Sequence, residues 1–261
     1  ESSNFAVKGL KGANILVVED NQVNQLVARE MLEAAGVVVR VADDGEQALK
    51  RLEDQLITYD AVLMDIHMPV MDGYSATKAI REKYGDQLPI IALTANATTE
   101  EKKRCLGIGM SDFLTKPIES DTLYKVLSQW VNTEQDKENK ETNVKPSPRP
   151  QAESLAAADT GEAPQRNDAD SGAVVSMTDL EERFKAHPTI IPRIFQSFKE
   201  SFGDFENQFM EAVEASDEET MYRLAHSLKG SAANISAERL RALSSDLEEK
   251  LKAKQQIEAM E

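Results

Sequence analysis

Five short apolar segments, each followed by a stretch of helical pattern, organise residues 13–130. They are rich in branched side chains, as buried strands of a parallel sheet are, and they lie at 14–18, 37–41, 61–65, 90–94 and 112–116. The helical stretches begin near Asn21, Gly45, Gly73, Thr98 and Glu119. Five such β-α units predict an α/β domain with a parallel sheet and helices on both faces.

The composition changes at residues 132–172, which hold no aromatic residue and four of the nine prolines of the chain. A segment with so few apolar side chains cannot bury enough surface to offset its ordering entropy. We therefore expect a disordered linker here, between a first domain at 12–131 and a second domain at 174–261.

The second domain carries three apolar stripes at helical spacing, after a short leading helix over 177–186. The stripes consist of Phe195, Phe198, Phe202, Phe205, Phe209 and Val213; of Met221, Leu224, Leu228 and Ile235; and of Leu240, Leu243, Leu247 and Leu251. They predict three long amphipathic helices of an antiparallel bundle. A closed bundle needs a fourth, which would start near Gln256, so we expect the last helix to be cut off or supplied by a partner.

Charge and cysteine content narrow the classes of function. The net charge of −16 argues against nucleic acid as a partner. A single cysteine, Cys105, excludes an internal disulfide and a cysteine-based zinc cluster, and its predicted helix favours a packing role. No apolar run is long enough for a membrane helix and no signal peptide opens the chain, which predicts a cytoplasmic setting.

Polar side chains gather at the expected carboxyl ends of the strands in the first domain. They are Glu19, Asp20, Asp65, Thr94 and Lys116. In a parallel sheet these ends meet at one crevice. Three carboxylates there would repel one another, and a Mg²⁺ ion with oxygen ligands would relieve that repulsion. With the lysine and the hydroxyl, the set could hold a phosphoryl group on one carboxylate. Each residue alone also fits an ordinary role as a helix cap, turn residue or surface lysine.

Four motifs, "ILVVEDN", "VLMDIHMPVMDG", "ALTANA" and "FLTKP", closely resemble response-regulator receiver domains over residues 12–131. The opening "LKGANILVVEDNQVNQ" is similar to receivers attached to hybrid sensor kinases. The resemblance implies a (βα)5 flavodoxin-like fold with five parallel strands.

The receiver resemblance also implies roles for individual residues. Asp65 would be the phosphoacceptor, and Glu19, Asp20, Asp65 and the main-chain carbonyl of His67 would bind Mg²⁺. Thr94 and Lys116 match the phosphate-sensing hydroxyl and lysine of the family. Phe113 matches its switch aromatic, held inward by packing because phenylalanine has no hydroxyl.

His226 stands out among the three histidines of the chain. At ~100° per residue it points ~150° away from the centre of the apolar stripe on its helix, so we expect it to be solvent-exposed. Lys229 follows at i+3 and could neutralise a phosphate, and Gly230 at i+4 leaves space beside the imidazole. Histidine is largely neutral near pH 7, so a ring nitrogen can act as a nucleophile. A chance surface histidine is the alternative; His187, before Pro188, is assigned a structural role.

The segment "LAHSLKGSAANI" resembles the phosphoacceptor helix of histidine-containing phosphotransfer (HPt) domains, and the likeness covers about residues 174–254. It is specific at His226, Lys229, Gly230 and Ser231 and implies that His226 is phosphorylated. The last bundle helix of the family is not visible in the sequence, in line with the expected truncation.

Together the two resemblances predict a phosphorelay. Asp65 would accept a phosphoryl group from an upstream histidine kinase core, exchange it with His226, and a separate response regulator would dock at His226. The absence of an ATP-binding motif indicates a segment of a hybrid sensor histidine kinase whose parent could be membrane-anchored elsewhere. Two alternatives remain: an aspartate-nucleophile phosphohydrolase, although His67 replaces its usual second aspartate, and a docking scaffold that is not phosphorylated.

Overall fold

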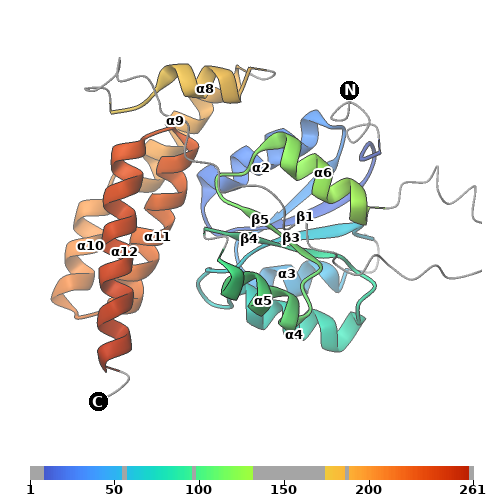
Figure 1. Cartoon of the computed structure of the whole chain (residues 1–261), viewed down its shortest axis with the longest axis horizontal. Coiled ribbons are helices and arrows are strands. Elements are labelled where there is room, and N and C mark those ends of the chain that lie inside the picture. The colour runs from blue at the N-terminus through green and yellow to red at the C-terminus, as the bar shows by residue number, and fades with distance from the viewer. Residues whose placement is uncertain (1–8, 55–57, 96–97, 132–173, 186–187, 259–261) are drawn as a thin grey trace, which may run out of the picture.

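The structure is a computed structural model that describes residues 9–54, 58–95, 98–131, 174–185 and 188–258 (Figure 1). The first part contains β1 (Asn14–Val18), α2 (Gln22–Ala34), β2 (Val38–Ala42), α3 (Gly45–Leu52), β3 (Ala61–Asp65), α4 (Gly73–Tyr84), β4 (Ile90–Thr94), α5 (Thr99–Ile108), β5 (Asp112–Thr115) and α6 (Ser120–Trp130). The second part contains α8 (Met177–Arg183), α9 (Ile190–Phe202), α10 (Phe205–Glu214), α11 (Glu218–Asn234) and α12 (Glu238–Glu258).

The five described strands form one parallel sheet in the order β2-β1-β3-β4-β5, as the flavodoxin-like prediction requires. Figure 1 shows α2 and α6 on one face of the sheet and α3, α4 and α5 on the other. Every residue of β3 and β4 is buried between these two layers, which explains why both strands are apolar on both faces.

The expected strands of the first domain are confirmed to within one residue at each end, and the helices begin within one residue of the expected positions. The second strand begins at Val38 and not at Val37, because the backbone N–H of Val37 donates to Leu32 O in the turn that closes α2. The helices begin where short polar side chains accept hydrogen bonds from the first turn, as Asn21, Asp44 and Asp72 do.

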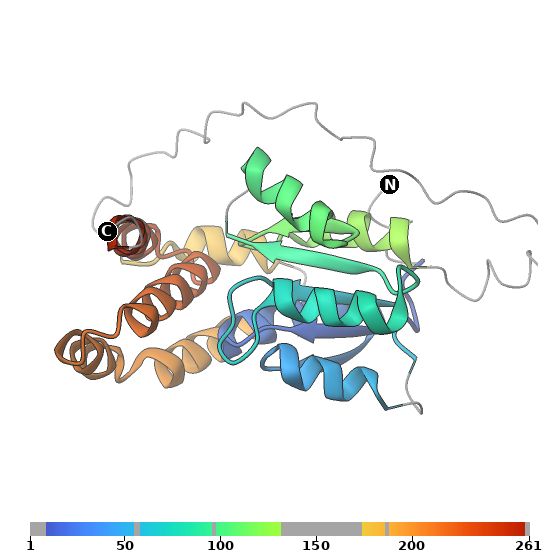
Figure 2. The same ribbon diagram turned by 90° about the horizontal axis from the view of Figure 1, so that it is seen from below.

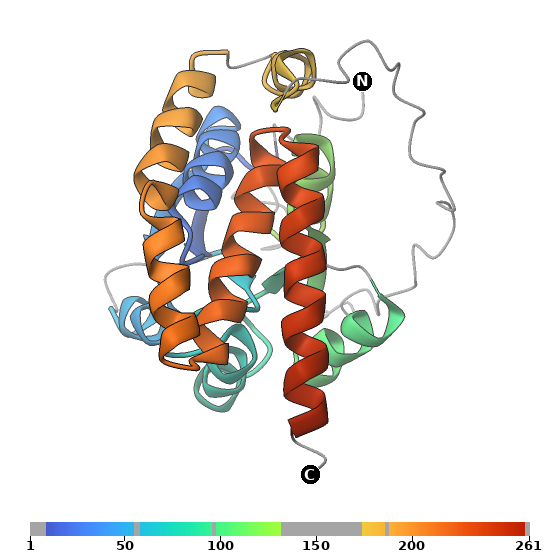
Figure 3. The same cartoon turned by 90° about the vertical axis from the view of Figure 1, so that its left-hand side faces the viewer.

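The phenylalanine stripe of the second domain belongs to two helices, where the sequence predicted one. The chain leaves α9 at Gly203 and Asp204, two residues of low helix propensity, and α10 begins directly after them. The turn is tight: a Cβ on Gly203 would lie 2.8 Å from the carbonyl oxygen of Lys199. Figure 3 shows α9 and α10 following one another along one side of the bundle, with α11 and α12 beside them.

The bundle leaves part of its last predicted stripe uncovered. Leu240 packs against the core, whereas Leu243 on the same helix is 61% exposed and no described helix covers it. The helix α12 also continues through Gln256 to Glu258, so the expected start of a new helix near Gln256 is wrong.

One hydrophobic cluster runs from the sheet into the bundle. It joins side chains of β1, α2 and α6, such as Val17 and Leu26, to Ile191, Ile194 and Ala232 of the second domain. Figures 1 and 2 show the bundle lying beside the sheet domain, with α2 next to α9 and α11. The two domains therefore pack directly on each other. The predicted linker at 132–172 and His187 lie outside the described residues.

Candidate functional site

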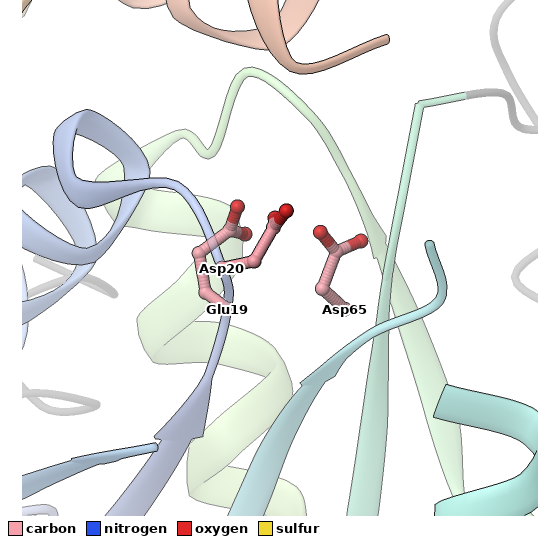
Figure 4. Close-up of side chains that lie close together, drawn as sticks. All are labelled: Glu19, Asp20 and Asp65. Atoms are coloured by element: carbon pink, nitrogen blue, oxygen red, sulfur yellow. The ribbon is translucent and has the colours of Figure 1, made fainter. Parts of the chain in front are cut away.

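Three carboxylates meet at the carboxyl edge of the sheet. Glu19 and Asp20 directly follow β1, and Asp65 is the last residue of the neighbouring strand β3. One oxygen of each lies within 4.8 Å of the others, and Figure 4 shows the three carboxyl groups close together at the open end of the two strands. Oxygen ligands gathered this closely fit a small divalent cation such as Mg²⁺.

Lys116 supplies the fixed positive charge of this edge. Its Nζ lies 2.7 Å from Asp65 Oδ2 and 2.7 Å from Glu19 Oε2, and the side chain is only 6% exposed. Burial alone would lower the pKa of Lys116, but the two neighbouring carboxylates outweigh burial and raise it. The lysine therefore remains charged and partly compensates the carboxylates.

One lysine does not neutralise three acidic groups. Burial, reinforced by the charge of Asp65, raises the pKa of Glu19 to about 8. The same two causes raise the pKa of Asp20 to about 6. The site thus disfavours further negative charge, and a bound cation would reverse this.

The other residues predicted for the receiver site lie around this edge. Thr94 is the last residue of β4 and is buried. The backbone N–H of His67 lies 3.4 Å from Asp65 Oδ1. Phe113 in β5 is half-buried against the core under α4 and α5, with the Lys102 ammonium 4.6 Å from the ring centroid. Cys105 is fully buried in α5, as expected of a packing residue.

His226 lies on the α11 face that meets this edge of the sheet. Its ring centroid is 4.7 Å from that of His67, and Tyr222 stacks on it at 6.1 Å. His226 is only 7% exposed, so the expected solvent exposure is wrong. Hydrophobic periodicity identified the side of α11 that faces its own bundle correctly, but it could not reveal that the first domain and α12 cover the opposite, polar side.

Glu248 on α12 completes the surroundings of His226, and sequence reasoning missed it. Its Oε1 lies 2.9 Å from His226 Nδ1 and accepts a hydrogen bond from Tyr222 Oη, while its Oε2 accepts one from Lys229 Nζ at 2.9 Å. Burial would raise the pKa of Glu248. The hydrogen bonds that it accepts from His226 and Lys229 outweigh burial and lower this pKa to about 2. Glu248 is therefore ionised at neutral pH.

Polar side chains hold α11 against α2 across the domain boundary. Asn21 Nδ2 donates to Ser227 Oγ at 2.6 Å, and Ser231 Oγ donates to Asn21 Oδ1 at 3.0 Å. Asn234 Nδ2 donates to Asn24 Oδ1 at 2.7 Å. A Cβ on Gly230 would lie 3.4 Å from Asn24 Nδ2. Gly230 therefore lies directly against the receiver domain, and a side chain longer than a methyl group would meet Asn24. The sequence had suggested only that Gly230 leaves space beside the imidazole.

A polar cleft of about 130 Å³ lies between the carboxyl edge of the sheet and the residues around His226 on α11 and α12. It is lined by Thr94, His67, His226, Lys229 and Glu248, among others. The predicted acceptor His226 therefore shares this cleft with Thr94, at the end of β4, and with His67, two residues after Asp65.

Comparison with known protein families assigns a family to each of the two domains. Residues 15–128 match the response regulator receiver domain family, and residues 193–261 match the Hpt domain family. The protein thus combines a receiver domain with an Hpt domain, and each matched region belongs to the family that its motifs resemble.

Its relatives include histidine kinases. The sensor histidine kinase GacS of Pseudomonas protegens is 41% identical over 46% of this chain and 13% of its own length. The osmosensing histidine protein kinase SLN1 of Saccharomyces cerevisiae is 40% identical over 51% of this chain and 11% of its own length. The chain thus matches only a small part of the length of these relatives.

A solved structure, the magnesium-bound receiver domain of a sensor histidine kinase from Pseudomonas aeruginosa PAO1, is 48% identical. It covers 46% of this chain and 97% of its own, with a TM-score of 0.42.

None of the helices among the described residues is sufficiently long and apolar to span a bilayer.

Proposed function

We propose that this chain carries phosphoryl groups between Asp65 and His226 as a segment of a phosphorelay. The observation that carries the proposal is the docking of α11 on the carboxyl edge of the sheet: His226 lines an interdomain cleft with Thr94 and His67, and His67 is two residues after Asp65, the last residue of β3. Each acceptor has a lysine beside it or one turn away, Lys116 on one side and Lys229 on the other.

On the receiver side, the carboxylate of Asp65 is the acceptor. Lys116 Nζ donates to Asp65 Oδ2 at 2.7 Å, and Oδ1, which the His67 backbone N–H approaches at 3.4 Å, would take the phosphoryl group. Glu19, Asp20 and Asp65 would hold Mg²⁺ together with the main-chain carbonyl of His67, and the ion would neutralise phosphoryl oxygens. Thr94 would bind a phosphoryl oxygen through its hydroxyl, and Phe113 would respond to the movement of Thr94.

On the Hpt side, Glu248 selects the reactive nitrogen. Its ionised carboxylate can only accept a hydrogen bond, so the proton of the neutral imidazole stays on Nδ1 and Nε2 keeps its lone pair. As a bond forms between Nε2 and phosphorus, the bond from phosphorus to the Asp65 oxygen breaks and its electron pair returns to the Asp65 carboxylate. Glu248 then stabilises the positive charge that develops on the ring.

The docking of the two domains limits which partner proteins can reach His226. Because His226 is buried against the receiver domain, a separate response regulator cannot reach it until the two domains part. We propose that an upstream histidine kinase core phosphorylates Asp65, that a separate regulator accepts from His226, and that the parent is a hybrid sensor histidine kinase. The predicted domain boundaries at 12–131 and 174–261 belong to this proposal.

The phosphohydrolase alternative is disfavoured by His67. A general acid at this position would have to be protonated near pH 7. Burial lowers the pKa of the His67 ring to about 4, so the ring is neutral there.

A phosphotransfer time course tests the proposed function. The chain is treated with Mg²⁺ and a small acyl-phosphate donor or a phosphorylated kinase core, and the label is located by its chemical stability. A base-labile acyl phosphate on Asp65, followed by an acid-labile phosphoramidate on His226, is expected. Asp65→Asn should abolish both signals and His226→Gln only the second. Absence of label from both residues would contradict the proposal in favour of the docking scaffold.

A further inference from the structure

A continuous series of hydrogen bonds runs from the Hpt domain to the carboxylate edge of the receiver domain. A terminal nitrogen of Arg183 donates to Asn234 Oδ1 at 3.0 Å, and Asn234 Nδ2 donates to Asn24 Oδ1 at 2.7 Å. Asn24 Nδ2 then donates to Glu19 Oε1 at 2.7 Å. We call these four residues the amide chain.

The direction of every bond in the amide chain is fixed from its Arg183 end. A guanidinium group has only donors. Arg183 therefore turns the amide oxygen of Asn234 toward itself and the amide nitrogen toward Asn24. The amide nitrogen of Asn234 donates to Asn24 Oδ1 and so holds Asn24 with Nδ2 facing Glu19. Both asparagines are 5% exposed, so water does not replace these bonds while the domains are docked.

Other contacts hold the members of the amide chain in place. The backbone N–H of Asn24 is capped by Asn21 Oδ1 at 3.1 Å, and Arg183 also donates to the carbonyl of Ile118 in the receiver domain at 3.0 Å. The amide chain thus links the end of α8, the end of α11 and the start of α2. Its last member, Glu19, is one of the three grouped carboxylates.

We propose that the amide chain couples Hpt docking to divalent cation binding at Glu19, Asp20 and Asp65. Outer partners that orient a ligating group tune metal affinity, and here Asn24 orients Glu19 while the other domain orients Asn24. Docking therefore strengthens cation binding, and by thermodynamic reciprocity the cation strengthens docking by the same factor. This inference rests on the proposed function for the cation site and adds regulation of that site by the Hpt domain.

The test is the dissociation constant of Mg²⁺ for the full chain, measured by calorimetry. Removing an outer partner of a metal ligand costs about 10–100-fold in affinity, so we expect that loss for Asn24→Ala and about threefold or more for Asn234→Ala, one bond further out. Asn234→Asp keeps the acceptor for Arg183 but lacks the donor for Asn24, and should weaken binding at least as much. Both Asn234 variants leave the receiver sequence unchanged.

Ser227→Ala is the matched control, because it removes an interdomain hydrogen bond from Asn21 Nδ2 and leaves every hydrogen bond of the amide chain in place. It should leave Mg²⁺ affinity within twofold of the parent chain. Unchanged affinity in both Asn234 variants, or an equal loss in Ser227→Ala, would overturn the role of the amide chain.

Amide hydrogen exchange of α11 measures the reciprocal effect. Mg²⁺ should increase protection of residues 226–234 in the parent chain and in Ser227→Ala, and should have no such effect in the Asn234 variants. Equal protection by Mg²⁺ in all chains would contradict the coupling. Labelling of Asp65 by the acyl-phosphate donor separates this result from the proposed function: normal labelling without any Mg²⁺ coupling rejects the amide chain alone, and coupling without labelling rejects phosphotransfer alone.

Discussion

His226 Nδ1 lies 2.9 Å from Oε1 of Glu248, a residue of the following helix that binds Lys229 with its other oxygen. One carboxylate thus holds both the proposed nucleophile and the cation one turn away. When a phosphoryl group binds to Nε2, its oxygens compete with Glu248 Oε2 for the hydrogen bond that Lys229 Nζ donates. The relationship makes Glu248 a positioning residue, since it acts on the reacting nitrogen through the ring.

Replacing Glu248 should therefore slow transfer to His226 without removing the acceptor. We expect Glu248→Ala to lower the rate constant of transfer from Asp65 by roughly 10–100-fold, at or below the lower limit of the effects of acid–base groups, because Glu248 acts only through the ring. Glu248→Gln retains an amide oxygen for Nδ1–H and should lose less. Quenched-flow transfer gives the rates, and ¹⁵N chemical shifts of His226 give the tautomer. A slow Glu248→Ala variant with an unchanged tautomer would show that Glu248 acts only on folding or docking.

Lys116 should be required for stability as well as for chemistry. Removing one partner of a buried ion pair costs about 3–5 kcal/mol, and Lys116→Ala leaves two buried carboxyl groups without their cation. Urea unfolding in the absence of divalent cations should show this loss. Lys50→Ala is the control, because Lys50 pairs with Glu46 on the surface with a 73% exposed side chain, and it should change stability by less than about 1 kcal/mol. Similar losses in both variants would contradict a special role for Lys116.

The raised pKa values of Glu19 and Asp20 set the pH dependence. Glu19 titrates near 4.5 when unfolded and near 8 when folded, so between these values the folded chain holds a proton that the unfolded chain releases. The free energy of unfolding without metal should therefore fall as pH rises from about 4.5 to 8, with Asp20 adding to the fall up to about pH 6.

Mg²⁺ should reverse this dependence, because it binds the ionised carboxylates. Its stabilising effect, measured by thermal unfolding, should grow as pH rises through the same range. Glu19→Gln should flatten both curves. A stabilisation by Mg²⁺ that is equal at pH 5 and pH 8 would show that the cation does not displace protons from these groups.

The receiver fold was predictable because its signals are local. Buried parallel strands such as 61–65 and 90–94 are apolar on both faces, and the helices between them begin at capping side chains. The rules of parallel sheets then bring Asp65 next to Glu19 and Asp20. A site made of strand ends follows from topology alone.

The Hpt site depends on contacts that no local pattern encodes. Glu248 lies 22 positions after His226 and on another helix, and a single glutamate in a charged helix carries no signal of its own. The burial of His226 results from docking of a second domain across polar asparagine and serine contacts. The break between α9 and α10 needed two weak helix formers, Gly203 and Asp204, to outweigh a continuous apolar stripe.

Gly230 offers a test of whether the docked arrangement is the one that transfers. Leucine at this position should stabilise α11 by about 1 kcal/mol, because glycine is the poorer helix former, yet its side chain would meet Asn24 of the receiver domain. We therefore expect Gly230→Leu to part the domains, to raise the rate at which diethyl pyrocarbonate modifies His226 several-fold, and to slow transfer from Asp65 in proportion.

Gly107→Ala is the control for this change, since a Cβ there meets no atom within 4 Å and the residue lies in α5, away from the Hpt domain. It should leave modification of His226 and transfer from Asp65 unchanged. If Gly230→Leu exposes His226 but transfer remains as fast as in the parent chain, transfer does not pass through the docked state, because a ring that reacts freely with reagent is no longer held against the receiver edge.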